Sequence, residues 1–257
     1  MASRKSKIIG ISSAKGGVGK TITTINLAGV FKTLGKKVLI IDLDLYSGGI
    51  AVYLNKEAEK NFYNLVDDIN NNRYKDFMDY INHYDDHIDF LACPKDPRQA
   101  NKIDSKYIDL ILDKASFQYD VILIDTNHIL NEINVVALDK VDKILFIVTN
   151  DPIDLKNMRS LLSIFRDIGL NNYKVLLNNS RDPFKSYFDL YDIKNIIKNN
   201  IDYSLSSDFF IKDIDKYIMD GKIITLIPKV ATIFGKDYTA LVNIAADMLD
   251  EEGAKNE

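Results

Sequence analysis

Three glycines and two lysines stand within six residues near the start of the chain, a spacing that could hold a phosphate group. The stretch reads KGGVGKT at residues 15–21, between an apolar run and an amphipathic segment. Glycine lets the backbone curl until its N–H groups point inward, and the first turn of a following helix adds free donors and partial positive charge. In such a loop Lys20 would reach the terminal phosphates of a nucleotide, and the Thr21 hydroxyl would bind Mg²⁺. The residues expected to hold the phosphates are Gly16, Gly17, Val18, Gly19, Lys20, Thr21 and Ile22.

Carboxylates follow two further apolar runs. Residues 37–42 lead to Asp42 and Asp44, and residues 120–125 end at Asp125. Because ligands bind beyond the carboxyl ends of parallel strands, these side chains are expected beside the glycine-rich loop. A carboxylate there can bind Mg²⁺, directly or through water, or can position a water molecule for attack on a phosphate.

These side chains would be positioned by an alternation of short apolar runs and amphipathic segments, which is typical of a parallel sheet covered by helices. The runs are almost continuously apolar, so the strands are expected to be buried on both faces. The expected strands are 7–13, 37–42, 88–92, 120–125, 143–149, 173–178 and 201–205. The expected helices are 21–34, 62–70, 74–82, 104–117, 154–168, 190–199, 209–219 and 238–249. The pattern predicts an α/β fold with a three-layer, doubly wound, mostly parallel sheet.

Composition excludes several other kinds of site. The chain has 257 residues, 46% of them hydrophobic and 27% charged, with a formal net charge of -4, as in an ordinary globular protein. One cysteine, Cys93, excludes a disulfide framework and a multi-thiolate zinc site, and three histidines leave little room for a metal cage. No stretch approaches the roughly 20 apolar residues of a membrane span, and no leader is recognised, so a cytoplasmic protein is expected.

The KGGVGKT stretch resembles the phosphate loop, a deviant Walker A motif, of the ParA/MinD superfamily of P-loop ATPases. The resemblance covers residues 7–249, so we expect one ATPase domain over 1–257 with a short basic N-terminal tail and a short acidic C-terminal tail. It implies ATP and Mg²⁺ as cofactors, slow hydrolysis that a partner stimulates, and a homodimer that forms around ATP. In that family the extra lysine, here Lys15, reaches the phosphates of the partner subunit and assists phosphoryl transfer. The implied catalytic residues are Lys15, Lys20 and Asp44.

The strand-end residues are similar to further motifs of that family. Asp42 and Asp44 resemble its DxD element, which places Asp42 near the Mg²⁺ shell and Asp44 beside the attacking water. Asp125 resembles the Walker B aspartate, which contacts a water on Mg²⁺. Asn178 is similar to an asparagine that binds the adenine edge, a task that suits an amide with both donor and acceptor. The implied metal-binding residues are Thr21, Asp42 and Asp125.

The chain departs from the family just after Asp125. The family continues with Pro-Pro-Gly or a similar sequence, whereas here Thr126 is followed by Asn127, His128 and Ile129. A less rigid loop is therefore expected at this point. That expectation motivates one alternative function, a scaffold that binds ATP without hydrolysing it.

Three stretches, 42–51, 91–100 and 130–139, resemble the TadZ/CpaE branch, whose members serve Tad pilus assembly. This resemblance favours a switch that positions a pilus or secretion apparatus, with a protein of that apparatus as its partner. A ParA-type partition ATPase, which binds DNA nonspecifically through basic side chains, is the other alternative. The acidic C-terminal end, residues 247–253, disfavours a MinD-type membrane helix, because an anionic membrane would repel it.

Overall fold

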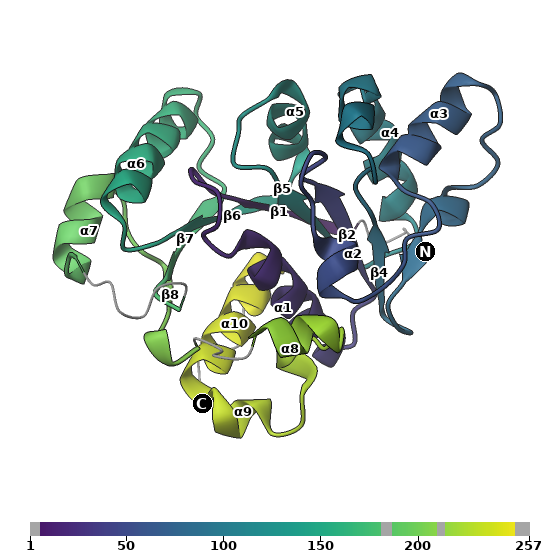
Figure 1. Ribbon diagram of the computed structural model, residues 1–257. Helices are drawn as coiled ribbons and strands as arrows, with labels where there is room; N and C mark the ends of the chain where they lie inside the picture. Colours follow the sequence, from purple (N-terminus) through teal and green to yellow (C-terminus); the bar gives the residue numbers. More distant parts are fainter. Residues whose placement is uncertain (1–5, 181–186, 210–213, 250–257) are drawn as a thin grey trace, which may run out of the picture.

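The computed structural model describes residues 6–180, 187–209 and 214–249, and within them one sheet of eight strands runs through the middle (Figure 1). The strands are β1 (Lys7–Ser12), β2 (Val38–Leu43), β3 (Asn82–His83), β4 (Ile88–Leu91), β5 (Val121–Thr126), β6 (Lys143–Val148), β7 (Tyr173–Asn178) and β8 (Tyr203–Leu205). Their order across the sheet is β3-β4-β2-β5-β1-β6-β7-β8, and every pair is parallel except β3 with β4. The central strands β2, β5 and β1 therefore end side by side at one edge.

Helices cover both faces of this sheet, which gives three layers (Figure 1). One face carries α1 (Lys20–Thr33), α8 (Ile214–Met219), α9 (Val230–Ile233) and α10 (Gly235–Met248). The other face carries α3 (Phe62–Asn70), α4 (Tyr107–Ser116), α5 (Glu132–Lys140), α6 (Pro152–Asp167) and α7 (Leu190–Ile197). The short helix α2 (Ile50–Tyr53) packs against α1 and α8. The 3₁₀ turns are η1 (Phe77–Tyr80), η2 (Pro97–Lys102), η3 (Ser207–Phe209) and η4 (Ile224–Leu226).

The two faces of the sheet are both apolar, so a core forms on each side. Successive strand residues point to opposite faces. On β1, Ile8 packs into the core with the α3–α7 helices, whereas Ile9 and Ile11 pack into the core with α1 and α10. Burying side chains of this size stabilises the fold by about 1.5–3 kcal/mol each. This burial fixes the strands that carry the polar residues at the edge.

All seven strands predicted from the sequence are present, and six predicted helices are confirmed with ends shifted by at most three residues. The helix predicted at 74–82 is wrong: only η1 forms, because Ile81 is extended and leads into the antiparallel strand β3. The helix predicted at 209–219 appears as η3 and α8, with 210–213 outside the described residues. The sequence did not predict the short elements β3, α2 and α9, nor α5.

The predicted basic and acidic tails fall largely on 1–5 and 250–257, which lie outside the described residues. In the part of the chain that the structure describes, no helix has both the length and the apolar character needed to span a membrane.

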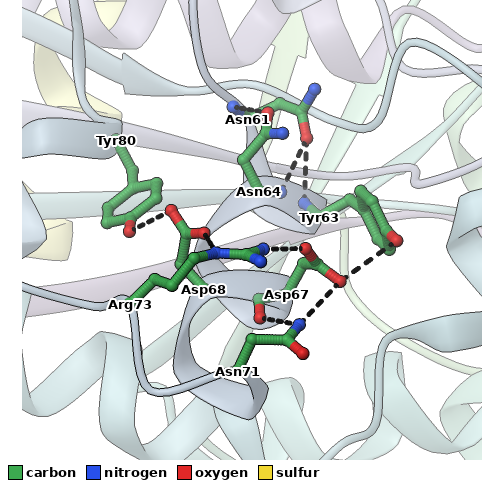
Figure 2. A network of polar contacts seen from close by, with 8 residues as sticks. All are labelled: Asn61, Tyr63, Asn64, Asp67, Asp68, Asn71, Arg73 and Tyr80. Atoms are coloured by element: carbon green, nitrogen blue, oxygen red, sulfur yellow. Dashed lines mark hydrogen bonds and ion pairs between the residues drawn. The ribbon is translucent and has the colours of Figure 1, made fainter.

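Polar side chains hold both ends of α3 (Figure 2). Asn61 and Asn64 form a capping box at its start, in which each side chain accepts a hydrogen bond from the backbone of the other. Near its end, Arg73 forms an ion pair with Asp68, and the Tyr80 hydroxyl donates to the same carboxylate at 2.7 Å. The residues drawn in Figure 2 are Asn61, Tyr63, Asn64, Asp67, Asp68, Asn71, Arg73 and Tyr80. These contacts fix α3 and the turn that precedes β3.

Candidate phosphate-binding site

Two glycines in the left-handed region shape the loop between β1 and α1. Gly17 has φ +77° and Gly19 has φ +98°, values that favour a residue without a Cβ. Gly19 is the N-cap of α1 and makes no side-chain cap to the first turn, so the helix has free N–H donors there. A Cβ on Gly17 would meet nothing within 4 Å, so the loop is open on that side. The backbone can therefore offer several donors to an anion.

Lys20 lies across this loop. Its ammonium donates to Ser13 Oγ at 3.1 Å, and Ser13 Oγ donates to the carbonyl oxygen of Lys15 at 2.8 Å. Lys20 is only 9% exposed, and this burial lowers its pKa, while the charges of Asp125 and Asp44 act in the opposite direction. The remaining N–H donors of the ammonium are available to a phosphate oxygen.

Thr21 and Asp125 meet beneath the loop. The Thr21 hydroxyl donates to Asp125 Oδ2 at 2.7 Å, and the Thr24 hydroxyl donates to Asp125 Oδ1 at 3.3 Å. Asp125 is 1% exposed, and burial raises its pKa to about 6, although the hydrogen bonds from Thr21 and Thr24 and the charge of Lys20 favour the ionised form. The structure thus joins two residues that lie 104 positions apart in the sequence.

The donor set fits a magnesium ion that is shared with phosphates. A hydroxyl and a carboxylate are hard oxygen ligands, and Mg²⁺ in proteins is usually held by one or two such groups together with substrate phosphates and water. Among the described residues, no group of three or more His, Cys, Asp or Glu side chains could hold a metal ion. Thr21 and Asp125 would therefore hold Mg²⁺ only with oxygens that a nucleotide supplies.

Asp42, at the end of β2, organises the loop that follows it. Its Oδ1 accepts a hydrogen bond from Asp44 N and its Oδ2 accepts one from Ile50 N, each at 3.2 Å. Burial and the neighbouring charge of Asp125 raise the pKa of Asp42 well above its usual value. A Cβ on Gly48 would lie 2.3 Å from Asp42 Oδ1, so only glycine fits at that position. Asp42 and Asp125 are aligned neighbours on β2 and β5.

Asp44 is half-buried, and a residue that the sequence did not single out binds it. Asn127 Nδ2 donates to Asp44 Oδ1 at 2.8 Å, and the Ser47 hydroxyl donates to the same oxygen at 3.1 Å. Asn127 is 8% exposed. The signal in the sequence was the departure after Asp125, where Asn127 stands in place of the first proline of the family.

The β5–α5 loop (127–131), which the sequence predicts to be less rigid than in the family, contains side-chain hydrogen bonds. Asn127 Oδ1 accepts from Ile129 N at 3.0 Å, and Asn134 Nδ2 donates to the carbonyl oxygen of Ile129 at 2.8 Å. His128 is exposed, and its ring atoms lie 3.4 Å from where a Cβ on Gly16 would stand. Amide side chains therefore constrain this loop where the family has prolines.

Asn178, at the end of β7, anchors the phosphate loop. Its Nδ2 donates to the carbonyl oxygen of Val18 at 2.9 Å, and its Oδ1 accepts from Ser180 N at 3.1 Å and from the Ser180 hydroxyl at 2.6 Å. Asn178 is 5% exposed. The expected contact with an adenine edge would have to use the N–H of Asn178 that Val18 does not take.

Lys15 and Ile22 point away from the loop interior. The Lys15 ammonium pairs with Asp151 at 3.1 Å, and Asp151 also caps the start of α6. Ile22 lines a small pocket with Tyr53 and Tyr217, so only its backbone faces the loop side of α1. The structure thus brings Lys20, the glycines, Thr21 and Asp125 together and leaves Lys15 at the rim.

This fold and this site define a P-loop nucleotide-binding protein. A family model described as an AAA domain matches residues 6–178, which is more than half of the chain. The chain therefore belongs to this family, whose members are P-loop ATPases of the ParA/MinD type. The predicted fold class is confirmed.

Known proteins resemble the chain in sequence or in fold. An uncharacterized ATP-binding protein of Methanocaldococcus jannaschii is 31% identical over 142 residues, which is 55% of this chain and 52%, or about half, of that protein. The crystal structure of a ParA family ATPase from Chlorobium tepidum superposes with a TM-score of 0.78 and 18% identity, covering 93% of this chain and 98% of that one. The septum site-determining protein MinD of Pyrococcus horikoshii, in complex with Mg-ADP, gives a TM-score of 0.75 and 20% identity, covering 96% of each chain. The Mg-ADP bound to that MinD matches the cofactors expected from the sequence, a nucleotide and Mg²⁺.

Gly19→Ala is expected to weaken nucleotide binding at least about tenfold. The left-handed backbone costs about 1–2 kcal/mol for a residue with a Cβ, and this Cβ would lie 2.7 Å from Asn178 Nδ2. Because that amide is fixed to Val18 and Ser180, the phosphate loop must move. Titration with a fluorescent ATP analogue measures the effect.

Gly35→Ala is the matched control for this prediction. Gly35 follows the other end of α1 and has φ +71°, and a Cβ at this position would meet nothing within 4 Å. The control shares the backbone strain without the clash. It should therefore lower the stability of the fold and leave the affinity for nucleotide unchanged. Equal affinities in Gly19→Ala and the unaltered chain would refute the role of this close approach.

Proposed function

We propose that the chain is an ATP-dependent dimerising switch that binds ATP and Mg²⁺, forms a homodimer around the nucleotide and hydrolyses ATP slowly to ADP and phosphate. The observation that carries this proposal is the separation of the two loop lysines. Lys20 is buried across the loop, whereas Lys15 stands at the rim against Asp151, with 38% of its side chain exposed. A lysine held by one exposed ion pair can exchange that partner for the phosphates of a second copy, because such pairs are worth only about 0–1 kcal/mol.

The residues of the site divide the chemistry among them. The loop N–H groups and Lys20 bind phosphate oxygens and stabilise the negative charge that shifts during transfer. Bound Mg²⁺ would neutralise charge on the phosphates, and Thr21 and Asp125 would hold it there. Asp44, in the loop after β2, orients the water that attacks the terminal phosphate. Lys15 of the second copy adds positive charge only after the dimer has formed.

Phosphate release under saturating ATP tests this function, with Lys15→Ala as the informative variant. We expect slow turnover in the unaltered chain and a loss of about a hundredfold or more in Lys15→Ala, because a cation supplied in trans to phosphoryl transfer is worth at least that much. Lys114→Ala, an exposed lysine on α4, is the matched control and should turn over normally.

The possible outcomes separate the alternatives. Full turnover in Lys15→Ala would exclude the proposed role of Lys15 at the active site of the second copy. Binding of ATP without turnover in the unaltered chain, even in single-turnover assays over hours, would instead support a non-hydrolysing scaffold.

As the finer function, we propose that this switch positions a pilus or secretion apparatus from the cytoplasm, through a protein partner that stimulates hydrolysis. Two of the stretches that resemble TadZ/CpaE proteins, 42–51 and 91–100, support this because they lie against each other: Cys93 Sγ is 3.6 Å from the carbonyl oxygen of Gly48. A partner that binds the second stretch could therefore sense the loop that carries Asp44. We also propose that the whole chain forms one ATPase domain.

Measuring DNA binding at increasing salt concentrations distinguishes the pilus or secretion role from a role in DNA partition. Weak binding with little dependence on salt agrees with a pilus or secretion role. Strong binding of the ATP-bound form that falls steeply as salt rises would instead show a nonspecific phosphate-backbone contact and support partition.

A further inference from the structure

We propose that Asn127 is a positioning residue that aims one oxygen of Asp44 at the attacking water. This inference rests on the proposed function, in which Asp44 orients that water. Asn127 lies in the β5–α5 loop, and Asp44 lies in the loop after β2, the strand next to β5 (Figure 1). The amide therefore joins two separate loops at the same edge of the sheet.

The two oxygens of Asp44 have different surroundings. Oδ1 accepts hydrogen bonds from Asn127 Nδ2 at 2.8 Å, from the Ser47 hydroxyl at 3.1 Å and from Ser47 N at 3.3 Å. In 6–180, 187–209 and 214–249, no hydrogen bond to Asp44 Oδ2 is formed. With Oδ1 fixed from two sides, the carboxylate cannot rotate freely, and Oδ2 is the oxygen left to accept a hydrogen bond from water.

The donor that holds Asp44 Oδ1 from the neighbouring loop is a neutral amide. Asp42 and Asp125 are aligned neighbours on β2 and β5, so Asp44 belongs to a cluster of three carboxyl side chains at this edge of the sheet. Like charges repel, so a hydrogen-bond donor on Asp44 Oδ1 helps to hold this carboxylate in place. The Asn127 amide supplies that donor without adding charge, and its burial at 8% exposure limits competition from water.

The second contact of Asn127 fixes the direction of its amide. Its Oδ1 accepts from Ile129 N at 3.0 Å, which orients Nδ2 toward Asp44. Ile129 is held in turn by Asn134, a residue of α5 that is 1% exposed. The chain of contacts therefore runs from a buried helix residue to Asp44. The same loop also brings His128 against Gly16 of the phosphate loop.

The two contacts of Asn127 can be separated by one isosteric substitution. Asn127→Asp keeps an oxygen that accepts from Ile129 N but replaces the donor to Asp44 with an acceptor. We expect turnover of ATP to fall about tenfold to a hundredfold, because a misplacement of about 1 Å in a catalytic group can cost about a hundredfold. The KM for ATP and ATP-dependent dimerisation should be unchanged, because Asn127 contacts neither the phosphate loop nor Thr21 in the described hydrogen bonds.

Asn131→Asp is the matched control. It makes the same chemical change in the same loop, but Asn131 uses its side-chain oxygen to cap α5 by accepting from Asn134 N at 2.9 Å. An aspartate can do the same, so kcat should stay at the value of the unaltered chain. Asn127→Ala removes the donor without adding a charge; it carries the test if Asn127→Asp does not fold, which thermal melting will show.

The outcomes of this experiment are distinct from those that test the proposed function. A lower kcat at constant KM in Asn127→Asp or Asn127→Ala, with normal Asn131→Asp, supports the inference. Normal kcat in both Asn127 variants overturns the inference and leaves the proposed function intact. No turnover in the unaltered chain overturns the proposed function, and the inference with it.

Discussion

Lys20→Ala is expected to weaken ATP binding roughly 30-fold to several thousand-fold, since truncating one member of a buried charge pair costs about 2–5 kcal/mol. Lys20 is the buried cation of the phosphate loop, and its ammonium is already oriented by Ser13 at 3.1 Å. Little of the binding free energy is therefore spent on fixing this long side chain. Calorimetric titration with ATP and Mg²⁺ measures the loss.

The fold should survive this substitution. Thr21 and Thr24 still donate to Asp125, so the buried carboxylate keeps its hydrogen bonds. The free energy of unfolding is expected to change by no more than about 2 kcal/mol.

Lys32→Ala is the matched control, because it makes the same substitution in the last turn of the same helix. Lys32 pairs with Asp85 at 2.8 Å and Asp86 at 3.0 Å. It should bind ATP like the unaltered chain. Normal affinity in Lys20→Ala would mean that the nucleotide binds elsewhere.

Asp44→Ala is expected to lower turnover at least about a hundredfold while ATP still binds, because a positioned acid or base contributes about 10²–10⁴-fold. Asp44 is half-buried and contacts Asn127 and Ser47, and none of its hydrogen bonds within the described part of the chain reaches the phosphate loop. Removing its charge also relieves repulsion on Asp42 and Asp125. The variant should therefore fold, bind ATP and dimerise, but it should fail to return to the monomer.

Asp109→Ala serves as the control for Asp44→Ala. Asp109 is an exposed carboxylate of α4 that pairs with Lys140 at 3.3 Å. Asp109→Ala should hydrolyse ATP at the rate of the unaltered chain. Turnover in Asp44→Ala equal to that of this control would remove Asp44 from the mechanism.

Most of the fold was predictable because the strands are long and buried on both faces. Runs such as Val121–Thr126 read as strands without knowledge of their neighbours. Three of the missed elements are too short for a periodic pattern of apolar residues to be recognised: β3 has two residues, and α2 and α9 have four each. The helix α5 was missed for another reason, since exposed Val135 interrupts the apolar pattern that marks the buried face.

The site was predictable as a set of residues but not as a set of contacts. The glycines, Lys20 and Thr21 are adjacent in sequence, so their chemistry could be read directly. Asn127 and Asp44 are 83 positions apart, and Asn178 and Val18 are 160 apart. No local spacing predicts such pairs, because the order of strands in the sheet brings them together.

Light scattering of Asp44→Ala with ATP and Mg²⁺ tests the dimerising switch most directly. This variant separates assembly from hydrolysis, so its mass reports the ATP-bound state alone. We expect twice the chain mass of 29.2 kDa with ATP, and the mass of one chain with ADP or without nucleotide. A variant that binds ATP but keeps the mass of one chain would contradict the proposed switch.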